Sequence, residues 1–109
     1  MALTQEQKQH IKETVRKRRA KAREGMDKAL TLTNEFVKEM NARKIDILHI
    51  DYHNTIYGMC SAIEMEGFEI ALYPELENKV VLHDGEKGLV QEFKNVKDSI
   101  KTVIEWLNK

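Results

Sequence analysis

Apolar side chains recur at steps of three and four over the first forty residues, as they do on one face of a helix. Thr4 and Gln7 have the spacing of a capping box, so the pattern predicts a helix over residues 4–43. An interior glycine costs about 1 kcal/mol relative to alanine. The pattern therefore leaves open one long helix or two helices that meet near Gly25. The apolar positions are Ile11, Val15, Ala22, Met26, Ala29, Phe36, Val37 and Met40.

A single helix of this length would be about 57 Å long at about 1.5 Å per residue. A domain of this chain length has a diameter nearer about 30 Å. The first half of the helix also offers few apolar side chains to bury. We therefore expect one domain over residues 1–109, in which residues 1–24 form a protruding basic helical arm that engages another subunit or partner.

The segment after the helix fits two periods. Residues 45–52 alternate as a strand does, and they also keep helical spacing with the residues that follow. Residues 54–66 are predicted to form a second helix, because Asn54 is a suitable N-cap and Gly67 a natural stop. The stripe that favours this helix consists of Ile56, Met59, Cys60 and Ile63.

The hydrophobic period then changes to two, which predicts three strands over residues 68–73, 80–83 and 89–93. A glycine-containing turn at 84–88 joins the last two strands into a hairpin. Asn95 caps a predicted C-terminal helix. The predicted fold class is therefore α+β: a long N-terminal helix, a second helix, a three-stranded antiparallel meander and a C-terminal helix, with the helices on one face of the sheet.

Charge is strongly segregated although the net charge is zero. Residues 1–44 carry twelve Lys or Arg and six Asp or Glu, a balance of +6, whereas residues 45–109 carry six and twelve, a balance of −6. A basic surface of this kind meets phosphates, an acidic protein, a small anionic ligand or the acidic half of another copy. The predicted basic binding face consists of Arg16, Lys17, Arg18, Arg19, Lys21 and Arg23.

His49, Asp51 and His53 form the second polar cluster. A helix would place the two histidines one turn apart, and a strand would point all three side chains the same way. This arrangement would suit a metal-dependent enzyme. However, zinc sites normally use three or four ligands, and the spacing fixes no further one. We therefore predict no metal site.

Three tyrosines, Tyr52, Tyr57 and Tyr73, could together line a shallow pocket. The chain contains no glycine-rich phosphate loop, nucleophile elbow or CxxC motif, so we predict no cofactor and no enzymatic activity. Cys60 is the only cysteine, which favours a reducing compartment. No apolar run reaches the about 18 residues that a membrane span requires, so we expect a cytoplasmic protein.

These features predict a small non-enzymatic binding or inhibitor-type module that acts stoichiometrically on a protein or ligand partner. We expect a homo-oligomer held by the N-terminal helices. The first alternative is a nucleic-acid-binding protein that uses the basic helix 16–23, although no aromatic residue is interleaved there to stack on bases. The second alternative is a metal-dependent enzyme around His49, Asp51 and His53.

Overall fold

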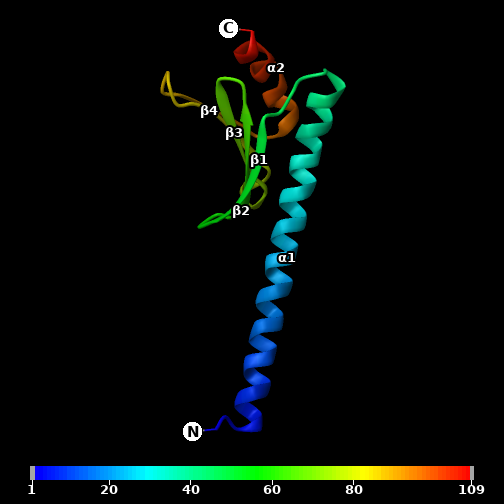
Figure 1. The fold of residues 1–109 in the computed structure, drawn as a ribbon, viewed down its shortest axis with the longest axis vertical. Helices are drawn as coiled ribbons and strands as arrows, with labels where there is room; N and C mark the ends of the chain where they lie inside the picture. Colours follow the sequence, from blue (N-terminus) through cyan, green and yellow to red (C-terminus); the bar gives the residue numbers. More distant parts are fainter. Residues whose placement is uncertain (1, 109) are drawn as a thin grey trace.

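Helix α1 runs without interruption from Gln5 to Ala42 and extends well beyond the rest of the molecule (Figure 1). The computed structural model describes residues 2–108, and its principal extents are 64 × 28 × 23 Å. After α1 come strands β1 (His49–Thr55), β2 (Gly58–Met65) and β3 (Phe68–Tyr73), the 3-10 turn η1 (Pro74–Leu76), strands β4 (Lys79–Asp84) and β5 (Leu89–Phe93), and helix α2 (Val96–Leu107).

The predicted capping box at the start of α1 is confirmed. The Gln7 backbone N–H donates to the Thr4 hydroxyl over 3.2 Å, and the Thr4 backbone N–H donates to the Gln7 side chain over 3.0 Å. Gly25 causes no break. A Cβ added at Gly25 would lie 3.6 Å from the Cβ of Met59, which is ordinary contact. The 4–43 segment is therefore one helix, and Gly25 lies where it passes the start of β2.

The helix predicted over residues 54–66 is wrong, because this segment forms the turn and second strand of the β1–β2 hairpin. The Thr55 hydroxyl donates to the Gly58 carbonyl over 2.9 Å and accepts from the Tyr57 backbone N–H over 3.1 Å. Gly58 completes the turn with φ of 88°, a conformation that favours glycine. Of the two interpretations of residues 45–52, the strand holds from His49 onward.

The sheet is an antiparallel meander of five strands in the order β1-β2-β3-β4-β5. The three predicted strands are confirmed as β3, β4 and β5, whereas the predicted total of three is wrong. The sequence leaves β1 open between strand and helix, and it predicts a helix where β2 lies. The C-terminal helix is confirmed as α2. The Asn95 side chain caps it by accepting from the Asp98 backbone N–H over 2.8 Å.

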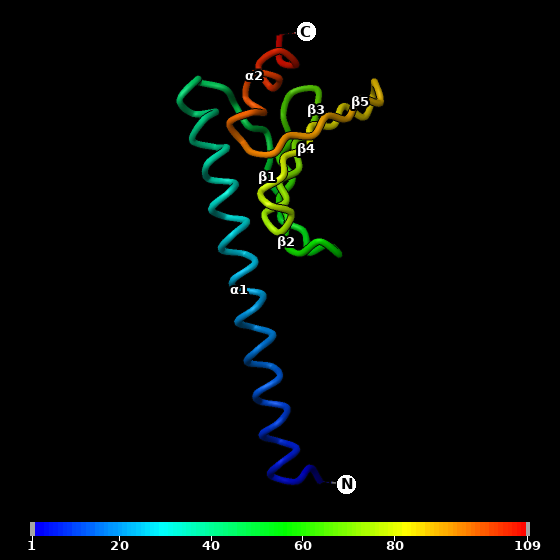
Figure 2. The backbone as a smooth tube through the Cα atoms, turned by 180° about the vertical axis from the view of Figure 1, so that it is seen from behind, coloured from blue at the N-terminus to red at the C-terminus, as the bar shows by residue number. Residues whose placement is uncertain are grey.

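One face of the sheet carries the core, and both helices cover that face (Figures 1 and 2). Strand pairing aligns Ile50, Ile63, Ile70 and Leu82 in a row across β1 to β4. From the helices, the core receives Leu32, Phe36, Met40, Val96, Ile100 and Val103. Because side chains alternate along a strand, the intervening residues lie on the other face, to which neither helix contributes core residues.

A buried polar contact joins α1 to the same face of the sheet. The hydroxyl oxygens of Thr33 and Ser61 lie 2.8 Å apart, and Thr33 also donates to the Ala29 carbonyl over 2.7 Å. Thr33 is 1 % exposed and Ser61 is fully buried. A buried hydroxyl left without a partner costs about 1–3 kcal/mol, so this contact fixes how α1 lies on β2.

The N-terminal half of α1, residues 5–24, stands clear of the sheet and is called the arm here; residues 25–108 form the head (Figure 2). Every residue of the arm except Thr14 is exposed. At about 1.5 Å per residue the arm is about 30 Å long. Within residues 2–108, no helix has a stretch long and apolar enough to cross a membrane.

The same glycine-to-alanine substitution should have opposite effects at two positions. Gly25→Ala should raise the free energy of unfolding by about 0.5–1 kcal/mol, because alanine favours the helix and the added Cβ has room. Gly58→Ala should lower it by about 1–2 kcal/mol through its positive φ. The Glu75 side chain, 2.5 Å from the new Cβ, would also have to move. Urea unfolding measures both changes. Changes of the same sign in the two variants would contradict the placement of Gly25 inside the helix and of Gly58 in the turn.

Candidate functional site

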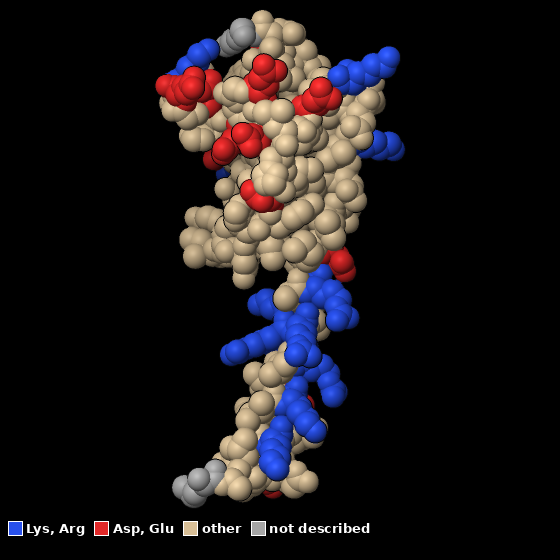
Figure 3. All heavy atoms as spheres, viewed as in Figure 1, with Lys and Arg blue, Asp and Glu red and all other residues tan. Residues whose placement is uncertain are grey.

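All six cations of the predicted basic face lie on the arm and are exposed. Figure 3 shows Lys and Arg gathered along the arm below the head. With Lys8 and Lys12 the arm has eight cations against Glu6, Glu13 and Glu24, a balance of +5. The ion pairs found within residues 2–108 include none of these eight cations. The arm therefore presents a net positive charge, and its eight cations are free of ion pairs within the described residues.

Five of these cations form a line, called the basic row: Lys8, Lys12, Arg16, Arg19 and Arg23. Their spacings of four, four, three and four residues place them on one side of the helix, over about 22 Å. Like charges at such spacings destabilise a helix by about 0.2–0.5 kcal/mol per pair. An anionic partner would remove this cost.

An apolar stripe runs along the arm beside the basic row. It consists of Ile11, Val15 and Ala22, of which Ile11 is 47 % and Val15 is 40 % exposed. It continues, at helical spacing, the stripe through Ala29 and Phe36 that packs on the sheet. The side of the arm that carries the stripe therefore faces the same direction as the part of α1 that is buried in the head.

The sheet face that the helices leave uncovered, called the open face, is acidic. Glu64 on β2 lies directly opposite Glu69 on β3. His49 pairs with Glu64, and His83 pairs with Glu69, so a row of four polar side chains crosses the sheet. Like charges directly opposite one another destabilise a sheet, unless a cation lies nearby.

Next to this row the open face has a floor of small side chains. Ala62, Ala71 and Val81 are aligned across β2, β3 and β4, and Asp51 and Glu92 pair at the two ends of the same row. The three floor residues are half-buried although no helix covers them. Small side chains on three adjacent strands allow another backbone to approach the middle of the sheet closely, between Asp51 and Glu92 at the two ends of the row.

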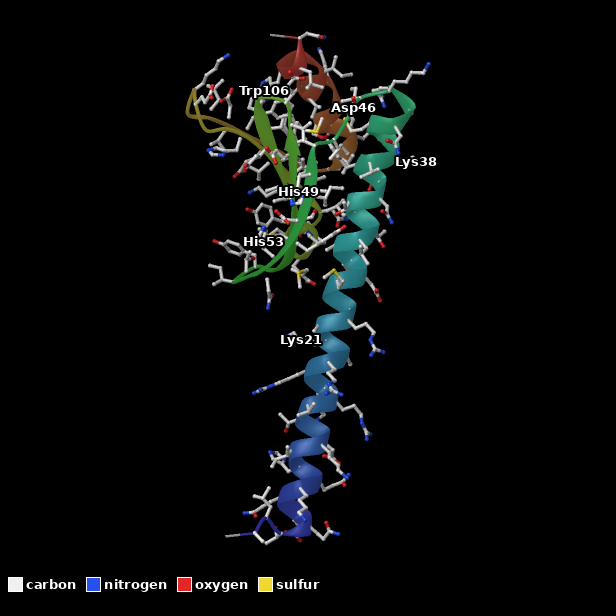
Figure 4. All side chains as sticks on the ribbon, viewed as in Figure 1. Lys21, Lys38, Asp46, His49, His53 and Trp106 are labelled. Carbon is white, nitrogen blue, oxygen red and sulfur yellow. The ribbon has the colours of Figure 1, made fainter. Side chains whose placement is uncertain are left out.

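The side chains of His49, Asp51 and His53 alternate along β1 with core-facing residues and therefore lie on the open face. Figure 4 labels His49 and His53 on this strand. His49 Nε2 lies 2.9 Å from Asp51 Oδ1, and both side chains are more than half exposed. Within the described part of the chain, no three His, Cys, Asp or Glu side chains come close enough to hold a metal ion. Of the predicted cluster, the structure therefore joins His49 to Asp51.

The structure brings together two of the three tyrosines. The rings of Tyr57 and Tyr73 meet edge to face, with centroids 6.4 Å apart and an interplanar angle of 84°. Tyr52 pairs with Ser61 and points to the helix-covered face. Of the predicted tyrosine set, the structure therefore joins Tyr57 to Tyr73 and places Tyr52 on the helix-covered face.

The sequence did not indicate a crevice at the root of the arm. Its volume is about 550 Å³, and it lies between α1 and the β1–β2 turn. Arg18 and Lys21 line it from the arm, and Ile56 and Tyr57 line it from the turn. Ile56 is 92 % exposed, an unusual degree for an isoleucine. The crevice depends on the hairpin, so no local sequence signal could have found it.

Comparison of the chain with family models, with curated proteins and with solved structures found no match.

Cys60 should be a poorly reactive thiol in the folded protein. Burial raises the pKa of Cys60, and a hydrogen bond to the His53 backbone opposes this with a smaller effect. The reactive thiolate is therefore scarce at about pH 8. Labelling with a thiol reagent should be much slower in buffer than in urea. The folded state favours the neutral thiol. The contribution of Cys60 to the free energy of unfolding should therefore be lost as pH rises through the raised pKa. Equal labelling rates would contradict this burial.

Proposed function

We propose that the protein is a non-enzymatic interaction module that acts stoichiometrically and recognises an acidic protein surface with its arm. The observation that carries the proposal is the uncovered arm, on which an apolar stripe and a basic row run side by side. The head supplies the rigid base that holds this helix in place. No catalytic arrangement of side chains is needed for such a role.

The physical state of the arm supports a role in binding. Most helical stability in proteins comes from packing of an apolar face, and the arm has no packing of its own. Its adjacent like charges add a further cost. A partner that covers Ile11 and Val15 would stabilise the arm by about 1.5–3 kcal/mol per fully buried side chain. It would also pair the cations of the basic row.

The arrangement of charge on the arm favours a protein partner. The basic row lies on one side of the apolar stripe, and Lys17, Arg18 and Lys21 lie on or beyond its other edge. The complementary surface is therefore an apolar strip between acidic groups. A protein surface offers such a strip, whereas a nucleic-acid backbone offers charge alone.

Site-specific crosslinking in expressing cells tests this proposal. A photoreactive phenylalanine analogue at Val15 should give a discrete crosslinked protein species, because Val15 lies in the apolar stripe. The same analogue at Glu105, exposed on α2, is the matched control and should give none. Lack of a protein species with the analogue at both Val15 and Ile11 would overturn the proposal.

Nucleic-acid binding is a second candidate, and the regular basic row favours it. The cations recur about every 6 Å along the helix, and a phosphate backbone also carries charge at regular intervals. This function would use the basic row as a line of phosphate contacts, without sequence specificity.

The nucleic-acid candidate makes a quantitative prediction about salt. Five phosphate contacts give a log–log slope of affinity against salt of about −4.5 on duplex DNA. Removing three cations of the row, with K12Q/R16Q/R19Q, should make the slope shallower by about 2.7 units. The matched variant K17Q/R18Q/K21Q removes equal charge outside the row and should change the slope less. Fluorescence anisotropy measures the slope for each variant. An affinity that does not change with salt concentration would exclude nucleic-acid binding.

A further inference from the structure

We propose that the acidic surface which receives the arm is the open face of a second copy of this chain, in a closed two-fold dimer. Each arm would lie on the open face of the partner, so the two contacts would be identical. The inference rests on the proposed function, because it names the partner of the arm.

The two surfaces have opposite charge. The arm has a balance of +5, whereas residues 25–108 carry nine Lys or Arg and fifteen Asp or Glu, a balance of −6. Lys79 is the only Lys or Arg within the five described strands, and it already pairs with Glu92 over 2.9 Å. Glu64 and Glu69 therefore lack a cation on the open face.

Each surface also has an unfavourable arrangement that the other would relieve. The basic row repeats like charges along the helix, and Glu64 and Glu69 oppose one another across the sheet. An arm docked along the strands of the open face would cross the acidic row and bring cations of the basic row to Glu64 and Glu69. The apolar stripe would then rest on the floor of Ala62, Ala71 and Val81, which allows a close approach.

The geometry of α1 lets both contacts form at once. The sheet lies on one side of α1 (Figure 1). The buried half of α1 and the arm use one continuous stripe, so the stripe of the arm faces that same side. A two-fold axis perpendicular to α1 near Gly25 would place the head of the partner beside the arm. The open face of the partner, turned away from its own α1, would then face the stripe. Such an interface is closed and self-complementary.

The dimensions agree with this arrangement. The arm is about 30 Å long, and β2, with eight residues, is about 26 Å long. A stable interface uses about 20–30 residues on each side, which the arm and the open face together supply. The axis would also pass close to the β1–β2 turn, so the exposed Ile56 and Tyr57 would meet their partner copies.

Pairing of the two arms with each other is the less favourable way to form a dimer. Each arm has a balance of +5, so an arm-to-arm contact would set like charge against like charge. Self-association through the arms therefore favours a contact between arm and head.

Charge-swap variants of the full chain test the dimer. The wild type should have the mass of a dimer at about 50 mM salt and of a monomer at about 500 mM salt, as salt screens the contact. Variants K12E/R16E/R19E and E64K/E69K should each be monomeric. An equimolar mixture of the two should form a heterodimer, because both of its contacts then join opposite charges. Light scattering after gel filtration measures these masses.

The control variant E35K/E105K makes the same change as E64K/E69K on exposed positions of α1 and α2, and it should remain a dimer. A monomeric wild type at low salt, a dimeric swap variant or a mixture that fails to pair would each overturn the inference. If the wild type is monomeric but Val15 still crosslinks to a different protein, the interaction module stands and only the second copy is excluded. Circular dichroism confirms that each variant is folded.

Discussion

The packing of one stripe of α1 against one face of the sheet is the contact on which the rest of the structure depends. Ala29, Phe36 and Met40 are fully buried there. Because α2 packs on the same face, the opposite face has no helix of its own chain to cover it. Because α1 is longer than the sheet it packs on, its N-terminal half extends past the end of the head as the arm (Figure 1).

The sequence predicted long periodic segments of this fold better than short ones. The long helix has a capping box and eight regularly spaced apolar residues, so its ends were predicted closely. The stripe Ile56, Met59, Cys60 and Ile63 had helical spacing by coincidence. In the structure Ile56 lies in a turn, and Cys60 and Ile63 point to opposite faces of β2. Ser61, a polar residue that faces the core, concealed the alternation.

Part of the candidate site could likewise be predicted from the sequence, and part could not. The cations of the arm were predicted because charge is a property of the local sequence. The side of the arm that faces the direction of the sheet could not be predicted, because that required the helix to continue through Gly25. The open face could not be predicted, because Glu64 and Glu69 become neighbours only through the pairing of β2 with β3. The helical spacing of apolar residues in 54–66 conceals the strand β2 and therefore its pairing with β3.

In the proposed interaction, folding and binding would use the same side of α1, and the difference between the two contacts would lie in amino-acid composition. In the head the stripe has large or fully buried residues, whose burial provides most of the stability. In the arm the apolar residues are fewer and stand beside cations. Fewer apolar residues make an isolated contact weak, whereas charge sets its orientation and its choice of partner. In the proposed interaction, a helix with this gradient would hold one sheet permanently and a second surface reversibly, and ionic strength would govern the second contact.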